Sequence, residues 1–210
     1  EFEDDPSVED KLGGLPSPRA AGDYLRDFTA SHLRAMNEFI ARQALSGRRQ
    51  LKASEVITLD IDSTSHVQSG DKMEGLAYNY KDEWCLDSLA VFDELGLGYG
   101  MELRPGNTFS GTGAPAMISR VLTQLPKIQG KHRVRADSAF CNEEFIRTCL
   151  LHNTEFTITA HDNMHWTDVA ARTTEWTPWV YSKEEQGEAQ KKGKRLPAIE
   201  TAHYNYQPGW

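Results

Sequence analysis

The chain has 210 residues, of which 39% are apolar and 10% aromatic, so it can bury the core of a good-sized domain and is not a disordered polypeptide. No apolar stretch approaches the roughly 20 residues of a membrane span, and no charged start followed by an apolar run indicates a signal peptide. The formal net charge is 23 − 31 = −8, which argues against a generally basic DNA-binding surface.

The cysteine pattern predicts free thiols. Cys85, Cys141 and Cys149 are an odd number and contain no CxxC pair, so they provide neither a disulfide framework nor a zinc ribbon. Reduced cysteines are typical of a cytoplasmic protein, and we expect that location, with no membrane partner.

The N-terminal part is predicted to be a flexible tail followed by helix. Residues 1–19 are acidic and then rich in glycine and proline, and we assign 20–50 to a helical segment. Apolar residues recur there at spacings of three and four, which indicates one face of a single helix or of two helices. Ser46-Gly47 is predicted to end the helix. The apolar positions are Leu25, Phe28, Leu33, Met36, Phe39 and Ile40.

Residues 51–160 alternate between strand and helix patterns. Three strands joined by short connections should form an antiparallel meander, and two more that arrive through helical crossovers should lie parallel to the first. This order predicts an α/β fold, an RNase H-like mixed five-stranded sheet with flanking helices. The glycines at 96, 98 and 100 are interpreted as a hairpin turn. The expected strands are 56–62, 86–92, 98–103, 132–137 and 155–160, and the expected helices are 116–125 and 142–151, the latter capped by Asn142.

The composition changes after residue 160. Trp166, Trp176, Trp179 and Tyr181 lie among polar residues, and a charged segment follows them. We interpret 161–210 as the start of a truncated β-rich insertion. Its tryptophans should pack in a core, or alternatively stack on unpaired bases. His161 and His165 have a zinc-like spacing but no third ligand, so we interpret them as surface residues.

Two acidic residues are placed where chemistry is expected. Asp62 ends the first predicted strand and Asp137 ends the fourth, and these strands should be parallel neighbours about 4.8 Å apart. Carboxylates at matching strand ends can share divalent ions, which activate a nucleophile for phosphodiester cleavage. The alternative is that each aspartate only caps a turn. Asp60 lies on the same face as Asp62 and could support it or form a structural hydrogen bond.

Four segments in order resemble the DDE transposases of bacterial insertion sequences, in the branch with a β-rich insertion before the third acid. They are LDIDST at 59–64, EGLAYNYK at 74–81, ELRPGNT at 102–108 and VRADSAF at 134–140. The resemblance covers about residues 15–165. It implies that Asp62 and Asp137 are the first two catalytic, metal-binding acids. The third is a glutamate on a later helix, expected beyond Trp210, because Glu175 and Glu200 lack a suitable helical context.

The same resemblance implies Mg²⁺ or Mn²⁺ as cofactor, transposon ends and target DNA as partners, and a homodimer for the full-length parent. This chain alone is expected to be inactive. Lys81, Arg104 and Arg135 could contact phosphates and Asn107 could hold a loop, although ordinary surface and turn roles are the alternative. Two other functions stay open: another RNase H-like metal-dependent nuclease, or a degenerate transposon remnant that binds DNA without catalysis.

Overall fold

The computed structural model describes residues 17–126, 132–160 and 166–203. The chain divides into two compact units, residues 1–159, called the core unit below, and residues 160–210, called the C-terminal unit. The predicted tail lies outside the described residues as far as residue 16, and the first helix begins at Pro18. His161 and His165 also lie outside them. No described helix is long and apolar enough to cross a membrane.

Two helices open the core unit: α2 (Pro18–Arg26) and α3 (Ala30–Gln50). The break follows from a capping box at Thr29, whose backbone N–H donates to the His32 ring. Helix α3 continues past Ser46-Gly47, so the predicted end was wrong. A Cβ on Gly47 would lie 3.6 Å from the Leu97 side chain, so this part of the helix packs against Leu97. The next residue, Arg48, is buried. Tertiary contact therefore outweighs the low helix propensity of glycine at this point.

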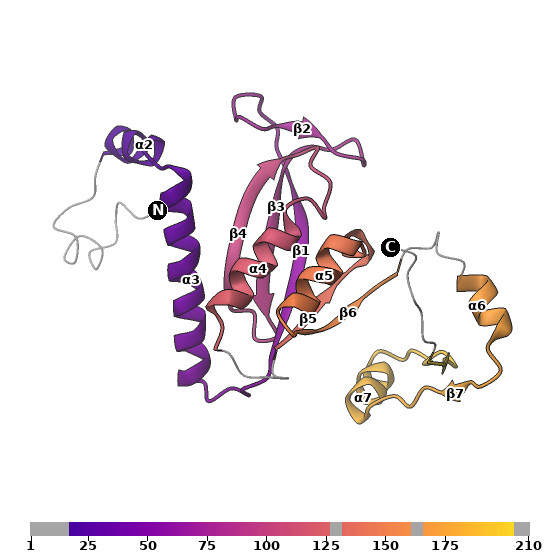
Figure 1. Ribbon diagram of the computed structural model, residues 1–210. Helices are drawn as coiled ribbons and strands as arrows, with labels where there is room; N and C mark the ends of the chain where they lie inside the picture. The colour runs from indigo at the N-terminus through magenta and orange to yellow at the C-terminus, as the bar shows by residue number, and fades with distance from the viewer. Residues whose placement is uncertain (1–16, 127–131, 161–165, 204–210) are drawn as a thin grey trace. The chain divides into compact units, whose positions relative to one another are not determined.

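The apolar face predicted for these helices is largely exposed. Leu25 is 63% exposed and Phe39 is 55% exposed, whereas α3 buries a different set of residues, Ala41, Ala44 and Arg48. Helix α3 instead lies along the edge of the sheet (Figure 1). The Asn37 amide there donates to the carbonyl of Met101 and accepts from its N–H, at 3.2 and 2.7 Å. This side chain therefore satisfies backbone groups that an edge strand leaves unpaired.

The mixed sheet has the predicted order with one added strand. Strand β1 pairs antiparallel with β3 and parallel with β5, β3 pairs antiparallel with β4, and β5 pairs parallel with β6. The two-residue β2 also pairs with β3 and was not predicted. The strands are β1 (Ile57–Val67), β2 (Ala77–Tyr78), β3 (Trp84–Asp93), β4 (Gly98–Pro105), β5 (His132–Ala136) and β6 (Glu155–Ile158). The RNase H-like topology is confirmed.

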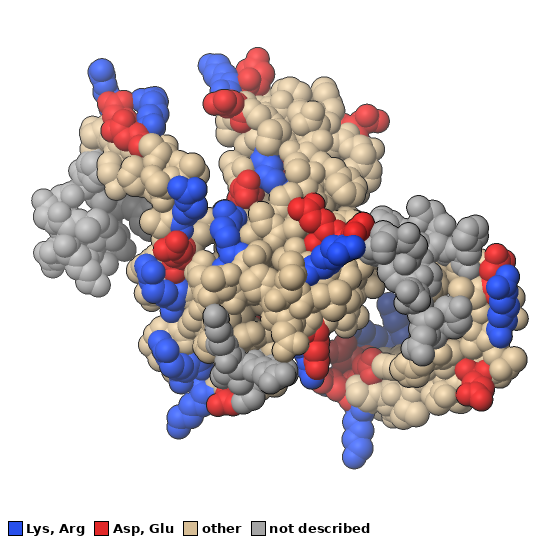
Figure 2. All heavy atoms as spheres, in the orientation of Figure 1, with Lys and Arg blue, Asp and Glu red and all other residues tan. Residues whose placement is uncertain are grey.

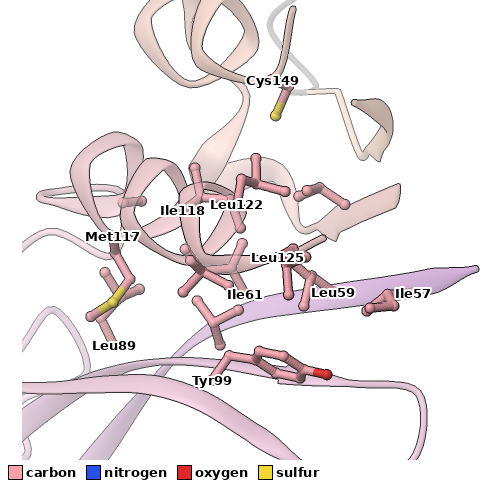
Figure 3. Packing of buried hydrophobic residues seen from close by; sticks show 14 of the residues in the cluster. Ile57, Leu59, Ile61, Leu89, Tyr99, Met117, Ile118, Leu122, Leu125 and Cys149 are labelled. Atoms are coloured by element: carbon pink, nitrogen blue, oxygen red, sulfur yellow. The ribbon is translucent and has the colours of Figure 1, made fainter. Parts of the chain in front are cut away.

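The core lies between one face of the sheet and two helices, α4 (Ala114–Gln124) and α5 (Glu143–Leu151). Alternate residues of β1, Leu59 and Ile61, point toward α4 (Figure 3). Helix α5 begins as predicted at Asn142, whose side chain accepts from the Phe145 N–H at 3.0 Å. On the opposite face, described residues such as Met101 and Leu103 remain 58% and 60% exposed. The central buried side chains are Leu59, Leu89, Val91, Tyr99, Met117, Ile118, Val121, Val134, Phe140 and Phe145.

The glycine-rich stretch after β3 is the predicted hairpin turn. Gly96 has φ +76°, and Asp93 Oδ1 accepts from the N–H groups of Leu95 and Leu97. The other Asp93 oxygen binds Arg48 at 2.7 Å in a buried ion pair. Burial and the hydrogen bond to Asp93 leave the pKa of Tyr99 well above its ordinary value, with burial the larger cause.

In its described residues the C-terminal unit has more helix than strand, and the β-rich insertion stays a prediction. It has α6 (Trp166–Arg172) and α7 (Lys183–Lys191), but only two short paired strands, β7 (Thr177–Pro178) and β8 (Glu200–Thr201). Helix α7 begins in a capping box between Ser182 and Glu185. Trp176 and Trp179 are 43% and 50% exposed, so they are not the buried core that we expected.

Candidate metal and nucleic-acid site

Asp62 and Asp137 lie on adjacent parallel strands of the core unit. The pairing of β1 with β5 runs as far as Asp60 opposite Arg135. Side chains alternate between faces, so residues 62 and 137 are the next positions on the face that Asp60 and Arg135 share. Asp137 directly follows β5. Adjacent strands are about 4.8 Å apart, so the two residues follow the last paired positions of neighbouring strands.

Asp62 does not end its strand, which corrects one detail of the prediction. Strand β1 continues to Val67 because residues as far as Val67 pair with β3. Its pairing with β5 stops earlier, at Asp60. Asp62 therefore occupies the open end of the β1–β5 ladder rather than the end of β1.

Local hydrogen bonds orient both carboxylates. Asp62 Oδ1 accepts from the N–H of Ser63 at 2.8 Å. Asp137 Oδ1 accepts from the N–H of Ala139 at 2.9 Å and so caps η1 (Ser138–Phe140), a single 3₁₀ turn. Each bond uses one oxygen, and in the described part of the core unit neither carboxylate has an ion-pair partner.

Asp60 differs from its neighbour because it has a cationic partner. Arg135 Nε and one terminal nitrogen each donate to a different Asp60 oxygen at 2.7 Å. The hydrogen bond to Asp60 raises the pKa of the Arg135 guanidinium. Asp60 thus has the structural role that we considered for it. Arg135 is 59% exposed, but its planar donor edge is directed at a carboxylate.

The two remaining carboxylates suit a divalent cation. They are like charges on neighbouring strands, and the only nearby arginine described, Arg135, is engaged with Asp60. Carboxylate oxygens are the usual ligands of Mg²⁺ and Mn²⁺. No group of three or more metal-ligating side chains is present among the described residues. Glu175 lies between α6 and β7, and Glu200 lies in β8, so neither is on a helix.

A cleft of about 830 Å³ opens beside Asp137. The turn after β2 contributes Lys81, the loop after β4 contributes Asn107, and β1 contributes Ser63 and Thr64. Lys81 and Asn107 therefore line the same cleft as one of the two acids, as a contact with nucleic acid would require. The full lining is Ser63, Thr64, Ser65, Val67, Tyr78, Asn79, Tyr80, Lys81, Glu83, Asp87, Gly106, Asn107, Thr108, Phe109, Ser110, Asp137, Ser138 and Ala139.

Arg104 cannot serve as the phosphate contact that we considered, because it is buried. Its side chain and that of Asp87 are 5% and 6% exposed and form an ion pair through two guanidinium nitrogens. A third nitrogen donates to the carbonyls of Ser110 and Thr112. Asp87 also accepts from the Ser63 hydroxyl at 2.7 Å. The pair fixes the loop after β4, and Asp87 was not singled out from the sequence.

Two glycines let this loop approach its neighbours closely. A Cβ on Gly106 would lie 2.0 Å from the Cys85 carbonyl oxygen and 2.6 Å from that of Ala77. A Cβ on Gly111 would lie 2.7 Å from the carbonyl oxygen of Ala139, two residues beyond Asp137. The loop is therefore held against β2, β3 and η1, where only glycine fits.

The described residues on the face seen in Figure 2 do not form the broad basic footprint of a duplex-binding protein. Figure 2 shows acidic and basic side chains interspersed on the face in view, separated by uncharged areas. This agrees with the net charge of −8. Bound divalent metal ions are one means by which an acidic site on such a surface can offset its charge.

The order of the mixed sheet defines the class, an RNase H-like domain. The family described as transposase DDE domain group 1 matches residues 21–207, and the chain belongs to this family. Membership connects the chain with DNA transposition and polynucleotidyl transfer. No curated protein matches it.

Several solved structures are similar at low identity. The catalytic domain of Mos1 mariner transposase is 12% identical, with a TM-score of 0.36 over 80% of this chain and 82% of that one. A Mos1 paired-end complex with Mn is 13% identical, with a TM-score of 0.36 over 89% and 69%. A simian T-cell lymphotropic virus intasome is 14% identical, with a TM-score of 0.32 over 54% and 37%. The chain thus spans less than two thirds of the intasome chain.

Proposed function

We propose that Asp62 and Asp137 are metal ligands of a transposase that cleaves DNA at transposon ends and joins the strand to target DNA. The observation that supports the proposal is the β1–β5 register, which ends with Asp60 opposite Arg135, two residues before Asp62 and Asp137 respectively. Its electrostatic support is the lack of a cationic partner for either acid in the described core unit.

The bound cation would be Mg²⁺ or Mn²⁺. It would activate the attacking water or 3′-hydroxyl and stabilise the leaving oxygen. The residues of the chain hold the two carboxylates in place through the N–H groups of Ser63 and Ala139. We assign no third carboxylate among the described residues, and we expect that the chain alone does not cleave DNA. DNA ends, target DNA and a homodimeric parent are the proposed partners.

The proposal is tested by Asp62→Asn and Asp137→Asn in a complete transposase that contains this segment. Each substitution should lower strand cleavage by more than about 100-fold, since even residues behind a metal ligand affect affinity by 10–100-fold. Thermal stability should not fall, because each change removes one of two like charges. Asp71→Asn, at another exposed aspartate, is the matched control.

Mn²⁺ binding by the isolated chain, followed by electron paramagnetic resonance, gives a second readout. Each asparagine variant should weaken binding, and Asp71→Asn should not. Retained cleavage in either variant, with binding equal to wild type, would contradict the assignment. Cleavage by the isolated chain would show that the third acid is already present in it.

A further inference from the structure

Three aromatic side chains with large exposed surfaces lie around the cleft beside Asp137. Tyr80 is 87% exposed, Tyr78 is 64% exposed and Phe109 is 62% exposed, and all three line the cleft. An exposed aromatic side chain contributes little to the stability of the folded chain. A cluster of exposed aromatic side chains therefore indicates a surface that contacts another molecule. Flat rings are suited to stacking on nucleobases.

The turn that carries Tyr80 is held in one conformation. Asn79 Oδ1 accepts from the N–H groups of Lys81 and Glu83 at 2.8 and 3.0 Å. The Asn79 amide nitrogen donates to the Ser65 hydroxyl on β1 and to the Glu83 carboxylate. The ring of Tyr80 is therefore presented by a rigid turn tied to β1, so little conformational entropy is lost when a partner binds.

The charges of the cleft favour a base over a phosphate backbone. Among the described residues that line the cleft, Lys81 is the only cation, whereas Glu83, Asp87 and Asp137 are acidic. Duplex binding depends on several cations that neutralise successive phosphates. A single lysine can contact one phosphate. The Lys81 Nζ lies over one face of the Tyr80 ring, 5.4 Å from its centroid, so a base would stack on the other face.

The cleft also offers polar groups for the edge of a base. Among the residues that the structure describes, the Asn107, Thr108 and Ser138 side chains have no hydrogen-bond partner, and all three line the cleft. An amide and two hydroxyls can both donate and accept. Gly106 and the Arg104–Asp87 pair fix the loop that presents Asn107 and Thr108.

We propose that this cleft binds one unpaired nucleotide of a DNA strand, with its base stacked on Tyr80 and its phosphate contacted by Lys81. Asn107 contacts the base edge, and Phe109 forms part of the apolar rim. The further statement that this strand is a DNA end next to Asp62 and Asp137 rests on the proposed function. The binding itself needs no metal and no third acid.

The test uses the whole 210-residue chain and two DNAs of the same length without divalent metal. One DNA carries 2-aminopurine in a short single-stranded overhang, and the other carries it paired in a blunt duplex. The chain should bind the overhang DNA more tightly and quench its fluorescence by stacking. Tyr80→Ala should weaken overhang binding about tenfold and abolish the quenching, while blunt-duplex binding changes less than about twofold. Tyr80→Phe should behave like wild type.

Tyr24→Ala is the matched control, because Tyr24 is 66% exposed on α2 and does not line the cleft. Circular dichroism verifies that each variant is folded. The proposal is overturned if the overhang DNA does not bind, if Tyr80→Ala affects both DNAs equally or neither, or if Tyr24→Ala has the same effect. Failure of the metal site would appear separately, as unchanged cleavage and Mn²⁺ binding in Asp62→Asn.

Discussion

Replacing Arg104 by methionine should destabilise the core unit far more than an ordinary charge substitution. The side chains of Arg104 and Asp87 are 5% and 6% exposed, so the substitution leaves a buried carboxylate without its cation. It also removes the donors to the carbonyls of Ser110 and Thr112. The loop that lines the cleft beside Asp137 should loosen together with the loss of stability.

The magnitude follows from this burial. Removing one partner of a buried ion pair costs about 3–5 kcal/mol, because the remaining charge stays desolvated. Exposed pairs contribute about 0–1 kcal/mol. The Arg133–Glu155 pair, 2.8 Å long with side chains 53% and 60% exposed, is therefore a suitable control. With a urea m-value of about 2 kcal/mol/M, Arg104→Met should lower the unfolding midpoint by about 2 M.

Urea unfolding followed by circular dichroism measures both substitutions, Arg104→Met and Arg133→Met. A double variant, Arg104→Met with Asp87→Asn, separates the cause. Asparagine removes the buried charge, so the double variant should be more stable than Arg104→Met alone. A buried ion pair between Arg104 and Asp87 is contradicted if Arg104→Met costs no more unfolding free energy than Arg133→Met, or if adding Asp87→Asn destabilises the chain further.

Two further predictions concern single positions. Gly106→Ala should cost about 3 kcal/mol of unfolding free energy, because its Cβ would lie 2.0 Å from a backbone oxygen, whereas Gly22→Ala, with open space around it, should not destabilise. Burial raises the pKa of the Cys149 thiol from 9.0 to about 11, so at pH 8 this thiol should react with Ellman's reagent only after unfolding, while half-buried Cys141 reacts in the folded chain. The same shift predicts lower stability as pH rises from 9 toward 11, because only the unfolded state ionises there.

A normal unfolding midpoint for Gly106→Ala would mean that the β4–α4 loop is not packed as tightly as its geometry indicates. Equal labelling rates for Cys141 and Cys149 in the folded chain would contradict the burial of Cys149 between α5 and the core. A constant unfolding free energy between pH 9 and 11 would contradict the raised pKa of the Cys149 thiol.

Local sequence patterns were sufficient for most elements of the core unit. The sheet order follows from strand spacing and from the rule that helical crossovers join parallel strands. Asn142 followed by Glu143 and Glu144 marked the start of α5 correctly. The parallel pairing of β1 with β5, which ends at Asp60 opposite Arg135, could therefore be predicted without coordinates.

Sequence patterns failed where a distant contact decides the outcome. The apolar residues at 25, 33, 36, 39 and 40 indicated a buried helix face, yet α3 packs through Ala41, Ala44 and Arg48. The end of α3 was misplaced because Arg48 is held by Asp93, 45 residues away. Helix periodicity reports that a face is apolar, and it does not report what covers that face.

The sequence by itself determined the order of strands and helices in the core unit, since alternation and crossover handedness are properties of the local chain. Only the tertiary structure decided which charged groups are buried and which are free. Arg104 and Arg135 are both arginines in strands, but one is enclosed with Asp87 and the other holds Asp60 at the surface. That difference arises from strand pairing and from the close approach of a loop, which no local pattern encodes.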